Sequence, residues 1–347
     1  MPIKLFLFFW ILLSIRIIFD FEFRTDIIVD PSVVQNHYIY TYLVCLIPAL
    51  AVLVSVRYID FDMAFKWLVG GHILFVLLYA YQTPNLFSTF SSEVRSAGSM
   101  ALNPIAFGQT GTTLSILCLC WFLNTSEQWQ KIVAGMCICI GILIIFSSGS
   151  RGPLLALIGS SLFYVIARQQ SPLWLILLLL VFGTFFYLLS DIFFDAIGNI
   201  SPVMVSRLTP TGNVDQYADL TTGRTELYQG AIDKFVKHPL WGDGHALFYP
   251  DGTIWYSHNM VLDAFMGLGL FGGALFVVVL TFVVWNSYQM IHMQHQFSWL
   301  GVLCICYVIS HMFSGTFYHA DVLNALFVIL LQSKLLCLYE KTKILIT

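Results

Sequence analysis

Charged residues are scarce in this sequence. Only 10% of its 347 residues are Asp, Glu, Lys or Arg, and 58% are hydrophobic, whereas soluble domains carry roughly 25% charge. A soluble core of this length could not hide so much apolar surface, so we expect lipid to be the main solvent. The sequence has no basic run and a net charge of −3, so the charge pattern indicates no nucleic-acid partner.

Signatures of metal and nucleotide chemistry are also missing. The sequence contains no H-E-x-x-H motif, no P-loop, no paired-cysteine metal signature and no carboxylate-rich cluster for Mg²⁺. Its eight cysteines lie inside or at the end of apolar runs, so we interpret them as small buried hydrophobic residues. Gly267–Gly272 fits G-x-G-x-x-G but follows no strand, and close helix packing explains it better. We therefore expect no metal and no cofactor.

Long apolar runs fill most of the chain. Because a helix needs about 20 apolar residues to cross a bilayer, the runs predict about ten spans. They lie near residues 4–21, 38–56, 67–82, 102–123, 132–147, 153–168, 172–190, 259–285, 298–317 and 320–338. The predicted fold class is an all-α, polytopic integral membrane bundle, with residues 1–347 forming a single membrane domain.

The positions of Lys and Arg predict the orientation. If the N-terminus is cytoplasmic, the short cytoplasmic loops carry the excess of Lys and Arg that the positive-inside rule requires, because long loops count little. An even number of spans then places both termini inside. The large loop, residues 191–257, is predicted to face outward.

This outward loop is predicted to contain an amphipathic helix. Residues 191–220 read as irregular, Thr221 or Thr222 can cap a helix, and His238-Pro239 ends it. Apolar side chains recur at helical spacing at Leu227, Ala231, Ile232, Phe235 and Val236. A helix of this kind can hold a site over the bundle, or it can simply pack on the membrane surface.

Three arginines on the outward side are candidates for binding phosphate. Arg95 and Arg151 lie in short segments at the ends of spans, and Arg224 opens the loop helix. The planar guanidinium group binds phosphate in a bidentate manner, and nearby glycine lets the backbone approach a ligand closely. The alternative for Arg95 and Arg151 is snorkelling to lipid phosphates.

His258 is the candidate general base. It precedes the eighth predicted span in Ser257-His258-Asn259, and histidine is the commonest general base near neutral pH. A lone histidine at a membrane interface also often has no catalytic role. Asn259 and Asp263 share one helical face and can support a polar pocket. Weaker or unassigned candidates are Arg16, His72, His311 and His319.

Four segments, taken together and in order, resemble a known family. They are RSAGSMALNPIAFG, FSSGSRGPLLAL, GRTELYQGAIDKFVKHPLWGDG and YSHNMVLDAFMGLGLFGG, and they are similar to the O-antigen ligase/polymerase superfamily of bacterial polysaccharide enzymes. The resemblance covers about residues 85–285.

The resemblance implies a metal-independent, inverting glycosyltransferase of the inner membrane, with its active site facing the periplasm. Its donor and acceptor are glycans linked to undecaprenyl pyrophosphate, and a chain-length regulator and a flippase are possible partners besides the bilayer. By position, Arg151, Arg224 and His258 match the family's catalytic residues, and Arg95 matches a looser element. We add Asn259 and Arg207 as substrate-binding candidates.

We expect a polymerase that joins lipid-linked repeat units for O-antigen or capsule. One alternative is a ligase that transfers glycan to lipid A-core. A second is a transporter or flippase of lipid-linked glycans, although the sequence lacks the paired half-repeats typical of transporters.

Overall fold

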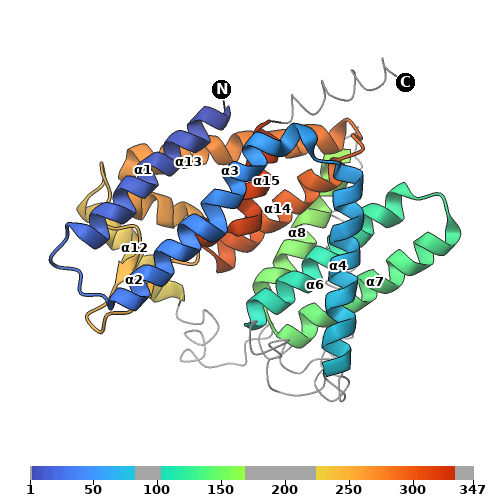
Figure 1. The fold of residues 1–347 in the computed structure, drawn as a ribbon, viewed down its shortest axis with the longest axis horizontal. Coiled ribbons are helices and arrows are strands. Elements are labelled where there is room, and N and C mark those ends of the chain that lie inside the picture. Colours follow the sequence, from blue (N-terminus) through green and yellow to red (C-terminus); the bar gives the residue numbers. More distant parts are fainter. Residues whose placement is uncertain (1, 83–102, 169–223, 333–347) are drawn as a thin grey trace, which may run out of the picture. The chain divides into compact units, whose positions relative to one another are not determined.

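The computed structural model describes residues 2–82, 103–168 and 224–332, and nearly all of its regular structure is helical (Figure 1). This confirms the predicted all-α fold class. Contacts between residues group the chain into two compact units. The first comprises Met1–Ile59, Thr221–Ser287 and His311–Thr347, and the second comprises Asp60–Leu220 and Tyr288–Ser310. The predicted single membrane domain stays a prediction.

Six described helices are long and apolar enough to cross a membrane. They are Pro2–Glu22, Pro31–Tyr58, Phe61–Tyr79, Pro104–Asn124, Gln128–Ser148 and Met260–His292. The chain is therefore a multi-pass membrane protein. The predicted span 172–190 lies outside the described residues, and so does the end of 320–338. The predicted spans 153–168 and 298–317 are helices α8 (Arg151–Arg168) and α14 (Ser298–Ser314), which are not among the six.

An aromatic core holds the first unit together. Helix α1 (Pro2–Glu22) packs against α13 (Met260–His292), since the rings of Phe9 and Phe276 lie 5.0 Å apart. Phe317, in the short helix η3 (Phe317–His319), lies 5.1 Å from Phe9. Trp10 Nε1 donates to the Asn324 side chain of α15 (Asp321–Leu331) at 3.4 Å.

The second apolar run of the first unit is one continuous helical stretch with a change of pitch. Asp30 caps α2 (Pro31–Tyr38) by accepting from the Ser32 N–H at 2.7 Å. A π-helical segment, η1 (Ile39–Leu46), follows, and then come α3 (Ile47–Ser55) and the single turn η2 (Val56–Tyr58). Pro48, at the start of α3, has no N–H to donate, so the preceding turn lacks one α-helical hydrogen bond.

Small residues close the helix contacts of the second unit. It contains α4 (Phe61–Gln82), α6 (Pro104–Asn124), α7 (Gln128–Ser148), α8 and most of α14 (Figure 1). A Cβ atom on Gly111 of α6 would lie 2.6 Å from the Gly141 carbonyl oxygen of α7, so these backbones meet directly. Thr112 Oγ1 donates to the Pro153 carbonyl of α8 at 3.0 Å.

In the first unit, the loop after α12 (Arg224–Lys237) packs on a break in α13. Gly269 has φ 63° and ψ −160°, which no other residue type adopts without strain, and it interrupts this 33-residue helix. The Leu270 N–H donates to the Pro239 carbonyl at 2.7 Å, and the Asp243 N–H donates to Met266 at 2.9 Å. The glycines in Gly267–Gly272 therefore allow close packing, as predicted, and the loop after α12 is one of the segments that packs against them.

The end of the predicted amphipathic helix is confirmed, because α12 ends at Lys237, before His238-Pro239. Its predicted caps, Thr221 and Thr222, lie outside the described residues, as does 191–220. A small hairpin that we did not predict follows, with β1 (Leu247–Phe248) antiparallel to β2 (Ile254–Trp255).

Candidate functional site

The turn between β2 and α13 carries His258, and neighbouring side chains hold this turn closed. Asn259 Oδ1 accepts from the N–H groups of Val261 and Leu262 at 3.0 and 3.1 Å, which caps α13. The buried Asp263 accepts from the Ser257 N–H at 2.9 Å. Asp263 therefore holds the main chain before His258, and Asn259 holds the main chain after it.

His258 itself has a strained backbone. Its φ of 61° lies in the left-handed region, which residues other than glycine adopt uncommonly. Such strain persists only where the surroundings enforce it, and it is concentrated at functional sites. The imidazole packs on Tyr256, with ring centroids 4.4 Å apart. Its buried Nδ1 has no hydrogen-bond partner among the described residues.

Arg224 and His258 meet at the end of α14. Arg224 is the first residue of α12, and its Nη2 donates to Ser314 Oγ at 3.1 Å. His258 contacts the main chain of Ser314. Asn259 Nδ2 donates to the Met312 carbonyl at 3.2 Å. Three of the predicted site residues therefore converge on residues 312–314, which sequence reasoning did not single out.

The electrostatics of this cluster keep the imidazole neutral. Burial, together with the positive charge of Arg224, lowers the pKa of His258 to about 4, and the contact with Ser314 partly opposes this shift. Burial also raises the pKa of Tyr256. A neutral imidazole beside a fixed positive charge can accept a proton while the guanidinium group faces an anion.

The other predicted site residues lie elsewhere. Arg151 is the first residue of α8. Helix α7 ends at Gly149, which has the left-handed conformation, and only Ser150 lies between Gly149 and Arg151. Arg151 belongs to the second compact unit, so its convergence with Arg224 stays a prediction. Arg95 and Arg207 lie outside the described residues.

A second polar cluster in the first unit escaped the sequence interpretation. Asp20 near the end of α1 is fully buried and accepts from His245 twice, from Nδ1 at 2.7 Å and from the main-chain N–H at 2.8 Å. Arg16 Nη2 lies 3.0 Å from its other oxygen. Arg24 donates to the Asp243 carbonyl. The available signal was a carboxylate four residues after Arg16 in an apolar run.

Three more rings continue from His245 towards His258. His37 lies 4.9 Å from both His245 and His319, and Tyr256 lies 6.2 Å from His319, measured between ring centroids. Burial lowers the pKa of His319 to about 4. Among the described residues, no group of three or more His, Cys, Asp and Glu is arranged to hold a metal ion.

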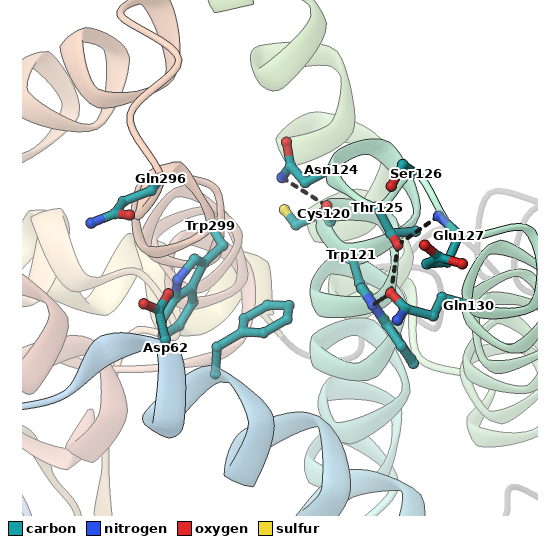
Figure 2. Close-up of a pocket in the computed structure, with 11 residues that line it drawn as sticks. Asp62, Cys120, Trp121, Asn124, Thr125, Ser126, Glu127, Gln130, Gln296 and Trp299 are labelled. Carbon is teal, nitrogen blue, oxygen red and sulfur yellow. Dashed lines mark hydrogen bonds between the residues drawn. The ribbon is translucent and has the colours of Figure 1, made fainter.

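A polar groove of about 390 Å³ lies in the second unit, where α6 ends and α7 begins (Figure 2). Trp121 Nε1 and Thr125 Oγ1 both donate to the Gln130 side-chain oxygen, which fixes one wall. Asp62 and Glu127 also line the groove, and none of its lining residues is Lys, Arg or His. Without a cation, this groove offers nothing to compensate the charge of a pyrophosphate group.

Comparison with known proteins finds a family similarity in the central part of the chain. Residues 135–277, less than half of the chain, match the O-antigen ligase family. The matched region contains Arg151, Arg207, Arg224, His258 and Asn259, whereas Arg95 precedes it. Searches of curated proteins and of solved structures found no match.

The family match supports the predicted resemblance to the O-antigen ligase/polymerase superfamily. It also supports an activity of the ligase/polymerase type, which resembles that of a glycosyltransferase. It implies lipid-linked glycan substrates and a membrane environment, in agreement with the apolar helices.

Proposed function

We propose that this chain of the O-antigen ligase/polymerase superfamily joins repeat units linked to undecaprenyl pyrophosphate on the periplasmic face of the inner membrane. The observation that carries the proposal is the meeting of Arg224 and His258 at Ser314. The chemistry needs a cation for a pyrophosphate leaving group and a base for a sugar hydroxyl, and this cluster holds both. A chain-length regulator and a flippase are the partners proposed for this activity.

The transfer proceeds as one displacement at the anomeric carbon of the donor. The acceptor hydroxyl oxygen attacks this carbon, its proton passes to the imidazole of His258, and the bond from the sugar to the pyrophosphate oxygen breaks. A positioned base contributes roughly 10²–10⁴-fold to such a step. Inversion follows from attack on the face opposite the leaving group.

The arginines stabilise the departing pyrophosphate. Negative charge grows on this group as the bond breaks, and guanidinium groups bind it through charge-assisted hydrogen bonds. We assign this role to Arg224 and Arg151, with Arg95 and Arg207 assisting, so that no metal is needed. Asn259 has the supporting role of holding the turn that carries His258.

The test is the lipopolysaccharide ladder of a deletion strain that expresses single variants. His258→Ala and Arg224→Ala are expected to abolish long chains while membrane levels of the protein stay normal. Asp233→Ala is the matched control, because this residue lies in the same helix as Arg224 with its side chain exposed. Long chains of normal length in the His258 and Arg224 variants would refute the proposal.

The second candidate is the ligase, which the description of the matched family favours. The same two residues would then transfer finished glycan to lipid A-core. The deletion strain separates the two activities. Loss of a polymerase leaves core bearing one repeat unit, whereas loss of a ligase leaves bare core and accumulates lipid-linked polymer.

A further inference from the structure

Helix α12 has an exposed apolar stripe besides its buried face. The stripe runs along Ile232 and Val236, which are four residues apart and therefore adjacent on a helix, and continues into Leu240 and Trp241 of the next turn. All four side chains are exposed, Trp241 by 72% and Val236 by 66%. Isolated apolar residues on a surface need no explanation, but a contiguous stripe does.

The packing of α12 on its own unit does not use this stripe. Ala231 is buried against Leu247 and Met266, and the ring of Phe235 lies 5.5 Å from that of Phe265. The apolar pattern of the helix therefore covers two neighbouring faces. One face fastens α12 to α13 and β1, and the other faces away from the unit.

The stripe joins an apolar surface of α13. The ring of Trp241 lies 5.4 Å from that of Phe271, and the main chains meet at the bond between Pro239 and Leu270. Leu270 and Phe271 are both exposed, and they belong to a helix that is long and apolar enough to span the membrane.

The length of α13 indicates where the bilayer ends. The part of α13 after the break at Gly269, residues 270–292, extends over about 35 Å at 1.5 Å per residue, so it can cross a hydrocarbon core about 30 Å thick without the part before Gly269. Residues Met260–Leu268 are largely buried by α12 and the loop, and exposed apolar residues begin at Leu270. The segment before Gly269 therefore lies outside the hydrocarbon core.

We propose that Ile232, Val236, Leu240 and Trp241 form an interfacial anchor that lies in the headgroup region of the leaflet that α13 enters. Tryptophan favours this depth, because its ring is apolar and its N–H needs a polar partner. The exposed Lys237 and His238 flank the stripe, where an anionic headgroup can meet them. The bilayer continues from the lipid-facing surface of α13 onto the stripe, so lipid is the partner that its position selects.

The anchor also fixes the height of the candidate site. Trp241 follows the end of α12 and contacts Phe271 of α13. Arg224 lies at the start of α12, and His258 lies just before the start of α13. Because residues 260–268 separate His258 from Gly269, His258 lies on the aqueous side of the hydrocarbon core and away from the acyl chains. This inference stands whether or not the proposed reaction is correct.

The depth of Trp241 can be measured by fluorescence quenching. The full chain is reconstituted in vesicles of phosphatidylcholine and phosphatidylglycerol, with bromine placed near the headgroup end or the methyl end of the acyl chains. Because the chain has nine tryptophans, the Trp241 signal is the difference between wild type and Trp241→Phe. Trp255→Phe is the matched control, since Trp255 is 49% exposed on the hairpin.

An anchor predicts that the Trp241 signal loses at least half of its intensity with bromine near the headgroup end and less with bromine near the methyl end. Aqueous iodide should quench it weakly. The Trp255 signal should respond to iodide and to neither lipid. Quenching of Trp241 by iodide alone would overturn the proposal, and so would protection from all three quenchers, which indicates a protein partner.

Discussion

His245 and His258 lie in the same compact unit and differ in burial, in backbone conformation and in hydrogen-bond partners. His245 is fully buried, has an ordinary backbone and donates to Asp20. His258 lies in the left-handed region beside Arg224, and its Nδ1 is without a partner among the described residues. Burial lowers the pKa of both. The surroundings separate a histidine that fastens a loop to a helix from the one that we propose as the base.

The largest expected effect is on the His245 side. Asp20→Ala removes the acceptor of two hydrogen bonds and the partner of Arg16, and breaking a buried ion pair costs about 3–5 kcal/mol. We expect much less folded protein, measured as the monodisperse peak of detergent-solubilised protein on size-exclusion chromatography. If the variant keeps the wild-type peak and melting temperature, then the Asp20 cluster does not hold the unit together.

The next effect concerns pH on the His258 side. A base must be neutral, and a pKa of about 4 keeps His258 neutral at all higher pH values. Transfer activity in proteoliposomes should therefore stay constant from neutral pH down to about pH 5 and fall only as pH approaches the lowered pKa. An acid limb centred at the ordinary histidine pKa of about 6.5 would contradict this assignment.

Arg224→Gln sharpens this prediction. Removing the positive charge raises the pKa of His258, because one cause of its lowering is gone. The residual activity should therefore show an acid limb at higher pH than the wild type, even though the overall rate falls.

A smaller effect is expected from the cap that supports His258. Asn259→Ala removes the acceptor for two N–H groups of α13, and such caps contribute about 1 kcal/mol. We expect a slight decrease in melting temperature and a larger loss of kcat, since the turn no longer enforces the strained backbone. Asn259→Asp keeps the capping acceptor but loses the donor to the Met312 carbonyl, so it should restore the melting temperature and not kcat; a melting temperature as low as that of Asn259→Ala would refute the capping role.

The smallest effect belongs to an exposed pair near the Asp20 cluster. Asp26 pairs with Arg24, but its side chain is mostly exposed. Surface ion pairs contribute little, so Asp26→Asn should leave both the chromatographic peak and the ladder unchanged. A loss comparable to that of Asp20→Ala would show that exposure does not separate the two carboxylates.

Part of this molecule could be read from the sequence for clear physical reasons. A bilayer forces a span to satisfy its own backbone, so apolar length predicts helices such as α1 and α13. The end of α12 follows from Pro239, which restricts His238. Arg224 and His258 were proposed from residue type and position, and their meeting at Ser314 agrees with that proposal.

The remaining features depend on long-range contacts that leave no local pattern. Asp20 and His245 are 225 residues apart, and neither shows its partner in its own segment. The left-handed φ of His258 accompanies the bonds that Asp263 and Asn259 make to the main chain on either side of it, and the modest preference of histidine for this region is too weak to predict it. The two-residue strands of the hairpin are too short for an alternating pattern to appear.

The main-chain hydrogen bonds between the loop after α12 and α13 also determine where the chain tolerates a change in length. Pro239 and Asp243 are four residues apart, as are their partners Leu270 and Met266, so the two segments match step for step. One residue inserted between Pro239 and Asp243 would put one of the two bonds out of register. In the described part of the chain, no main-chain hydrogen bond joins the hairpin turn around Gly252 to α13, and Asp251 in this turn is exposed. An epitope tag used to map which side of the membrane this loop faces therefore belongs at that turn.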